Sequence, residues 1–165
     1  MAANTTNKLK VTLRGDTDIL FEREFNAPRK LVWEAMSNPE YFKEWWGPRE
    51  QEIIKIDMDV RTGGEWRVTS RGPDGVEHPF KGVYREITPP EKMVWTFIYD
   101  VPPINEHEAV ETMTLEEIDG GQRTRLRAVS VHDSKEARDG HVEAGMEKGA
   151  AETYDRLEEL LKKMA

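Results

Sequence analysis

The sequence predicts an α+β fold in which a strongly curved antiparallel sheet of about six or seven strands surrounds a long C-terminal helix. Three observations predict it. Two short helical patterns separated by prolines follow the first strand-like runs, many short strand-like runs with hairpin turn signals come next, and apolar residues recur at helical spacing near the end of the chain. We therefore expect one domain over residues 1–165, with residues 1–8 disordered.

The chain begins with two strand-like segments, residues 9–14 and 18–26, which are separated by Gly15 and Asp16. The second segment carries alternating side chains on one face: Ile19, Phe21, Arg23 and Phe25. The first segment either pairs back onto the second through a turn at residues 15–17 or leaves an open edge, which invites pairing with a second chain. From this edge we expect a weak homodimer, with Tyr41, Trp45 and Trp46 as a second possible contact.

Two abutting short helices are predicted within residues 25–48, FNAPRKLVWEAMSNPEYFKEWWGP. Pro28 suits the first turn of a helix, and Asn38 with Pro39 ends the first helix and starts the second. The second helix carries four aromatic residues before Gly47 and Pro48 stop it: Tyr41, Phe42, Trp45 and Trp46. Such bulk on one face of two short helices predicts that they cover a pocket.

Six further strand-like runs follow, over residues 52–59, 65–71, 79–88, 92–100, 109–118 and 124–131. Glycine- and proline-rich turn signals separate several of them, at residues 62–64, 73–75, 89–90 and 119–121. Short strands joined by tight turns favour an antiparallel meander over a parallel sheet, which would need crossover helices.

The last predicted element is a helix over residues 143–164, which would be about 33 Å long and could cross a whole sheet. Gly145 and Gly149 fall inside it, and each helical glycine costs about 1 kcal/mol relative to alanine. Close packing of the helix against the sheet is the preferred reason for them, and a notch in the roof of a cavity is the alternative.

These segments carry a resemblance that spans nearly the whole chain. The 25–48 motif is followed in order by VRTGGEWR (60–67), RGPDG (71–75), GVYREI (82–87), PPEK (89–92), SKEARD (134–139), GMEKG (145–149) and YDRL (154–157). The chain thereby resembles the START-like (SRPBCC) superfamily, in the branch related to the activator of the ninety-kilodalton heat-shock protein's ATPase. The resemblance implies a helix-grip (START/Bet v-like) fold, often with a cleft between sheet and helix, and the branch name suggests a stress-response role.

Composition narrows the function classes. With 24 Lys and Arg against 32 Asp and Glu, the net charge of −8 disfavours nucleic acid and anionic membranes as partners. The absence of cysteine excludes disulfides and cysteine-ligated metals. We find no apolar signal core near the start, and so expect a cytoplasmic protein. We also expect no cofactor.

Aromatic and apolar residues on successive strands and on the last helix predict the ligand cavity. The candidate lining residues are Trp46, Trp66, Phe80, Tyr84, Trp95, Phe97, Met113, Met146 and Tyr154. The alternative is a fully packed aromatic core. Relatives often carry a larger residue where this chain has Ala150 and Ala151, which favours a wider cleft.

Catalytic signals are weak. The four histidines, His78, His107, His132 and His141, lack metal-ligand spacing and are interpreted as solvated surface residues. The alternative is that His132 and His141 converge at the foot of the last helix. Glu65, Arg67 and Arg85 are expected on the outer face of the sheet. A buried carboxylate facing the cavity could act as a general base, but Glu86 or Glu111 would do so only if the strand parity shifted by one residue.

The preferred function is therefore non-catalytic binding of an apolar or aromatic small molecule. The alternatives are a co-chaperone-like interaction module, with a chaperone as partner, and an enzyme of the cyclase or hydrolase kind acting on an apolar substrate. The cavity discriminates among them: a large dry cavity favours binding, a filled one an interaction role, and a titratable group on its floor catalysis.

Overall fold

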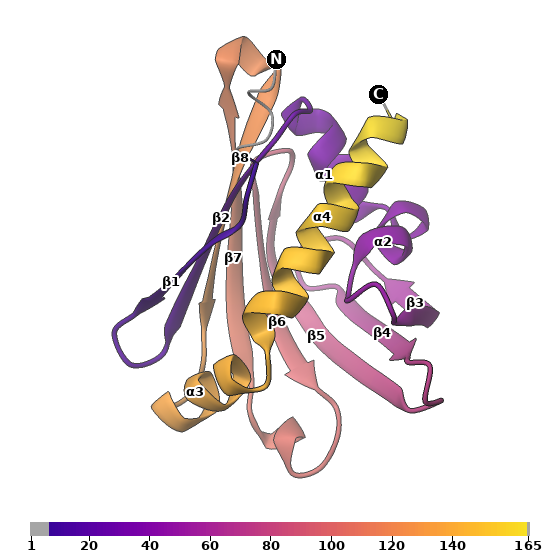
Figure 1. The fold of residues 1–165 in the computed structure, drawn as a ribbon, viewed down its shortest axis with the longest axis vertical. Helices are drawn as coiled ribbons and strands as arrows, with labels where there is room; N and C mark the ends of the chain where they lie inside the picture. Colours follow the sequence, from indigo (N-terminus) through magenta and orange to yellow (C-terminus); the bar gives the residue numbers. More distant parts are fainter. Residues whose placement is uncertain (1–6, 165) are drawn as a thin grey trace.

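The computed structural model describes residues 7–164, so the expected disorder of residues 1–6 lies outside the described part. Asn7, which was included in that expectation, is held in place: its side chain donates to Glu158 over 2.9 Å and accepts from Arg123 over 2.8 Å. The fold is the predicted α+β arrangement, with helices gathered on one side of a curved antiparallel sheet (Figure 1).

The sheet contains eight strands in the order β1-β2-β8-β7-β6-β5-β4-β3, every neighbouring pair being antiparallel. It is thus wider than the predicted six or seven strands, because every strand-like run of the sequence joins it. The strands are β1 (Lys10–Arg14), β2 (Asp18–Phe25), β3 (Glu52–Met58), β4 (Glu65–Arg71), β5 (Glu77–Thr88), β6 (Lys92–Tyr99), β7 (Ala109–Ile118) and β8 (Arg123–Val131). Short 3-10 turns, η2 (Ile104–Glu106) and η3 (Asp119–Gly121), interrupt the β6–β7 and β7–β8 connections.

Strand β1 pairs back onto β2 through a tight turn, in which Gly15 adopts a positive φ of 54°. The pairing within the chain, one of the two predicted alternatives, is therefore the observed one. Strand β1 nevertheless forms one edge of the sheet, and β3 forms the other. An edge strand keeps one row of backbone groups available for further pairing.

The two predicted short helices are α1 (Arg29–Ser37) and α2 (Pro39–Trp45). Asn38 separates them, and its side chain accepts a hydrogen bond from the backbone N–H of Glu40 over 3.0 Å, which caps α2. Both helices bury one face, through Val32, Ala35 and Met36 on α1 and through Phe42 and Trp45 on α2.

The predicted long C-terminal helix is present as α4 (Met146–Met164), which begins three residues later than the predicted 143–164. A short helix that was not predicted, α3 (Lys135–Glu143), precedes it and is capped by the Ser134 side chain. Gly145 lies between them with φ = 91°, a left-handed conformation that ends one helix and cannot continue it. The prediction that Gly145 lies inside the long helix is therefore wrong, and its conformation accounts for the glycine.

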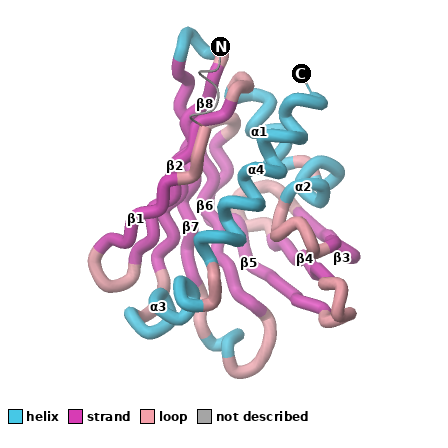
Figure 2. Tube along the Cα trace, in the orientation of Figure 1, coloured by secondary structure: helices cyan, strands magenta, loops and turns pink. Residues whose placement is uncertain are grey.

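Helix α4 crosses the concave face of the sheet, with α1 and α2 beside it (Figure 2). Leu157 and Leu161, in its C-terminal half, are completely or almost completely buried in the core. Arg23 is another anchor: it is 5% exposed on the inner face of β2 and forms an ion pair with Asp155 of α4 over 2.6 Å. The C-terminal half of α4 is thus fixed against the sheet, whereas its N-terminal half lies over a space.

Candidate ligand-binding site

A cavity of about 840 Å³ lies between the concave face of the sheet, α2, α3 and the N-terminal half of α4. Several residues that line it near α3 and η2 are exposed, including Ile104, His107, Glu136 and Ala144. The cavity therefore opens to solvent at this end. At the opposite end it is bounded by buried residues, among them Phe42 and Trp45.

Small residues on α4 account for the space. Gly149 and Ala150 line the cavity where a long side chain would have filled it, one turn before the buried Tyr154. A methyl group added at Gly149 would lie 3.9 Å from Cγ of Pro48, an ordinary van der Waals contact, so packing does not require a glycine here. The preferred prediction of tight packing at Gly145 and Gly149 is not what the structure shows, and at Gly149 the structure matches the alternative of a notch in the cavity roof.

The cavity wall is mainly aromatic and apolar. Seven of the nine candidate residues line it: Trp46, Phe80, Trp95, Phe97, Met113, Met146 and Tyr154. Trp66 and Tyr84 do not; they are buried behind Trp95, with the Trp66 and Trp95 rings stacked at a centroid distance of 4.6 Å. Trp66 is fixed there because its indole N–H donates to the Thr96 carbonyl over 3.0 Å.

Further lining residues were not among the candidates: Phe21, Met36, Phe42, Trp45, Met93 and Tyr99. Of these residues, Trp45 was recognised in the sequence as part of the aromatic motif of residues 25–48, but not as a cavity residue. Its indole N–H donates to the Ala35 carbonyl over 2.9 Å, and its ring stacks on Tyr154. Because Trp45 is buried and Trp46 packs against Phe80 inside the cavity, neither supplies the exposed aromatic contact considered for a dimer.

Glu111 is the main polar residue on the floor of the cavity. It lies on β7 between its cross-strand partners Trp95 and Ser130. The Trp95 indole N–H donates to Oε1 over 2.9 Å, and the Ser130 hydroxyl lies 2.8 Å from Oε2. Burial raises the pKa of Glu111, and these two hydrogen bonds oppose the rise only in part.

The expectation that Glu111 would face inward only after a shift in parity is wrong. Glu111 is two residues before Met113, so both side chains point to the same face of β7 without any shift. The alternation that placed Met113 in the cavity was therefore the signal that could have placed Glu111 there. Glu86 lies outside the cavity, where its carboxylate bonds Thr88 and pairs with Lys92.

All four histidines line the cavity. His107 and His141 are exposed, as expected of solvated residues. His78 and His132 are half-buried, and His107 pairs with Asp133 over 3.0 Å. The His132 and His141 rings lie 5.3 Å apart. Burial lowers the pKa of both rings, although solvent at the open end of the cavity screens part of the effect on His141.

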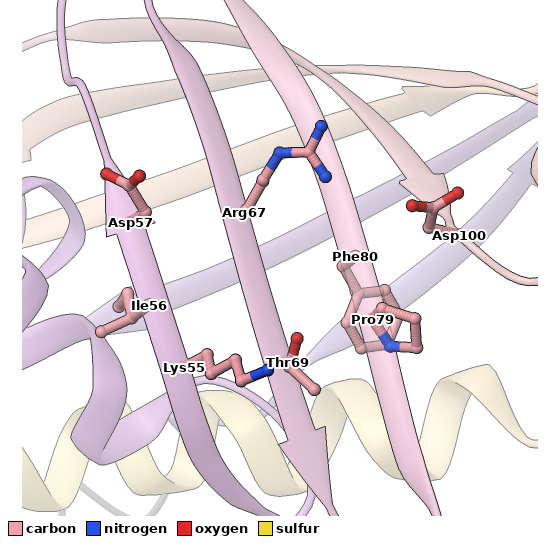
Figure 3. Close-up of a pocket in the computed structure, with 8 residues that line it drawn as sticks. All are labelled: Lys55, Ile56, Asp57, Arg67, Thr69, Pro79, Phe80 and Asp100. Carbon is pink, nitrogen blue, oxygen red and sulfur yellow. The ribbon is translucent and has the colours of Figure 1, made fainter.

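A second, smaller pocket of about 320 Å³ lies over β3, β4 and β5 (Figure 3). Arg67 and Thr69 line it and alternate with the buried Trp66 and Val68, so it belongs to the outer face of the sheet. Glu65, Arg67 and Arg85 are exposed, as predicted. The lining of this smaller pocket mixes charged residues with apolar ones: Lys55, Asp57, Arg67 and Asp100 with Ile56, Pro79 and Phe80.

Within residues 7–164 no group of three or more acidic or histidine side chains is arranged to hold a metal ion. None of the helices described is both long enough and apolar enough to cross a membrane.

Comparison with known proteins agrees with this architecture. The family model described as Activator of Hsp90 ATPase homolog 1-like protein matches residues 26–162. A protein from Nitrosomonas europaea is 29% identical, with 92% of this chain and 98% of that chain covered and a TM-score of 0.81. A protein from Arthrobacter aurescens is 24% identical, with 93% and 91% covered and a TM-score of 0.83. The AHSA1 protein from Silicibacter pomeroyi is 19% identical, with 90% and 99% covered and a TM-score of 0.75. Among curated proteins, none matches this sequence.

Proposed function

Because the chain belongs to the family of Activator of Hsp90 ATPase homolog 1-like proteins, a family of cleft-bearing domains, we propose that it binds an apolar or aromatic small molecule between sheet and helix. The observation that carries the proposal is the cavity of about 840 Å³ with a mainly aromatic wall. This volume falls within the range of about 300–1,000 Å³ that ligand sites occupy.

The roof of the cavity gives a direct test with an environment-sensitive apolar dye, N-phenyl-1-naphthylamine. Ala150→Trp should fill the cavity and abolish the fluorescence increase seen with the wild type. Lys148→Trp is the matched control, because Lys148 is exposed on the same helix and does not line the cavity. Ala150→Leu is the milder second variant, and thermal unfolding of each variant reports whether the fold persists.

Dye binding that is equally strong in wild type and in a folded Ala150→Trp variant would refute the proposal, since the dye would then bind elsewhere. In the wild type, dye at about 100 times its Kd should stabilise the protein by about 2.7 kcal/mol. For a chain of this size, that corresponds to a rise in Tm of roughly 5–10 °C.

Acid–base catalysis is a second candidate function, because Glu111 supplies one titratable group on the cavity floor. If Glu111 removes a proton from a carbon next to a carbonyl group, 2-acetylnaphthalene should exchange its methyl hydrogens for deuterium in D2O. The exchange should be faster with wild type than with Glu111→Gln. Equal rates, at the level without protein, would refute catalysis on this class of compound.

Contact with a heat-shock ATPase rests on the family's name alone and stays a prediction. A pull-down with a purified chaperone of that class, with and without ligand in the cavity, would test it.

A further inference from the structure

Glu111 is an isolated acid in an apolar wall. The rows of side chains on either side of it contain Phe97 and Ala109 toward the open end of the cavity and Met93 and Met113 toward the closed end. Its two hydrogen-bond partners, Trp95 and Ser130, are themselves 4% and 8% exposed and carry no charge. A carboxylate in such surroundings loses its hydration without gaining a positive partner, which favours the protonated form.

The hydrogen bonds leave a protonated Glu111 with a proton to donate. The Trp95 indole can only donate, so Oε1 is fixed as an acceptor. The proton then belongs on Oε2, beside the Ser130 hydroxyl, which can either donate or accept. A ligand oxygen that reaches Oε2 can therefore receive this proton in a hydrogen bond.

Tyr154 supplies a second donor from the opposite wall. It lines the cavity from α4 and is 8% exposed. Burial raises the pKa of the Tyr154 phenol, and a charge on Glu111 would add to the rise, so this hydroxyl keeps its proton. The nearest cation to influence Tyr154 is Arg23 on β2, and it is already paired with Asp155 and Glu158.

We propose that the Glu111 carboxyl and the Tyr154 hydroxyl form a donor pair that binds the carbonyl or phenol oxygen of a neutral aromatic ligand in the cavity. This inference rests on the proposed binding function and specifies its ligand class. Two donors that line one cavity, on the sheet and on α4, favour a ketone, aldehyde or phenol. An ionised carboxylate ligand whose charged group reached Glu111 would meet Trp95, Ser130 and apolar side chains there and no cation, because the histidines belong to other parts of the lining, so this part of the site discriminates against acids.

The test uses three probes of nearly identical shape: 2-acetylnaphthalene, in which the oxygen accepts; 2-isopropenylnaphthalene, in which a CH2 group replaces that oxygen; and 2-naphthoate, the anion. Their Kd values are measured by calorimetric titration of the full chain in mildly acidic buffer. The wild type should bind the ketone about three to ten times more tightly than the hydrocarbon, the contribution of one or two neutral hydrogen bonds. It should bind the naphthoate more weakly than either.

Variants at the two residues locate the effect. Glu111→Leu should keep only the part of the preference that Tyr154 supplies, and the double variant Glu111→Leu/Tyr154→Phe should bind the ketone and the hydrocarbon equally. Glu111→Gln, whose amide can donate, should keep more of the preference than Glu111→Leu. Tyr154→Phe should lose part of it. Infrared difference spectra of wild type against Glu111→Gln report the protonated carboxyl directly, through its C=O band, whatever the stability of the leucine variant.

The outcomes separate the two claims. If the ketone and the hydrocarbon bind the wild type equally, or if the preference is undiminished in Glu111→Leu, the donor pair is refuted and the binding function stands. An ionised Glu111 in the infrared spectrum would also refute the donor pair. If none of the three probes binds, both the donor pair and the proposed binding function are refuted.

Discussion

Gly82 on β5 lies directly opposite Trp66 on β4, and its lack of a side chain lets the Trp66 ring lie across β5. A methyl group at this position would come 2.5 Å from the Trp66 indole nitrogen and still closer to the Thr96 carbonyl oxygen. Real contacts of a Cβ atom are essentially never under 3.0 Å. Gly82→Ala must therefore push Trp66 away from Thr96 and break the hydrogen bond of 3.0 Å between them.

The cost follows from two effects. A buried indole N–H left without a partner costs about 1–3 kcal/mol, and overpacking of a tight core costs about 1–3 kcal/mol. Alanine in a strand recovers roughly 0.5–1 kcal/mol of backbone entropy relative to glycine. We expect Gly82→Ala to lower the free energy of unfolding by about 3 kcal/mol, which corresponds to a fall in Tm of roughly 6–12 °C.

Denaturant titration followed by tryptophan fluorescence measures the effect. Gly140→Ala makes the same chemical change in helix α3, where nothing lies within 4 Å of the added methyl group. This control should be stabilised by about 0.5–1 kcal/mol. If the free energy of unfolding of Gly82→Ala lies within about 0.5 kcal/mol of the wild-type value, this account of how Trp66 is packed behind the cavity wall is refuted.

Three further predictions concern the acid, the α2–β3 connection and the sheet edge. Burial raises the pKa of Glu111 in the folded state, so the native protein keeps a proton that the unfolded chain has already lost. The free energy of unfolding of wild type, measured relative to Glu111→Gln, should therefore fall as pH rises above the ordinary glutamate pKa; a pH-independent difference would contradict this. Arg156 donates to the backbone carbonyls of Glu44, Gly47 and Pro48. Arg156→Ala should lower the free energy of unfolding by about 1.5–3 kcal/mol and weaken dye binding. Unchanged dye binding would show that the α2–β3 connection does not shape the cavity. Sedimentation should show a weak dimer for the full chain and a monomer after deletion of residues 1–14, which removes β1; a monomer in both cases would end the dimer prediction.

The alternation of side chains and the turn residues were enough to predict the strands and the order of the elements. The two short helices followed from Pro28 and from the Asn38–Pro39 pair, whose chemistry is local. The long C-terminal helix was predicted correctly except for its start, because a glycine can continue a helix or end it, and only the φ of Gly145 decides between the two. Sequence spacing carries no information on that angle.

The cavity wall was predicted in part, for a related reason. Period-two alternation shows which face a strand residue occupies, but not how far from the core centre it lies, so Trp66 and Tyr84 could not be separated from Trp95. Glu111 was set aside because its strand parity was judged to face outward, although it lies two residues from Met113 and so shares its face. The histidines reach the cavity from β5, from two loops and from α3, and for His78 and His107 the sequence offered no local signal of this.

A crystal structure of the protein soaked with 2-acetylnaphthalene tests the central claim most directly. The account predicts that the ring system lies between Phe97 and Ala150, inside the cavity, with its carbonyl oxygen within hydrogen-bond distance of Glu111. Density for the ring in the cavity with the oxygen turned toward the open end would contradict the donor pair. A ligand bound only on the outer surface, with the space under α4 closed by side chains, would contradict the binding function itself.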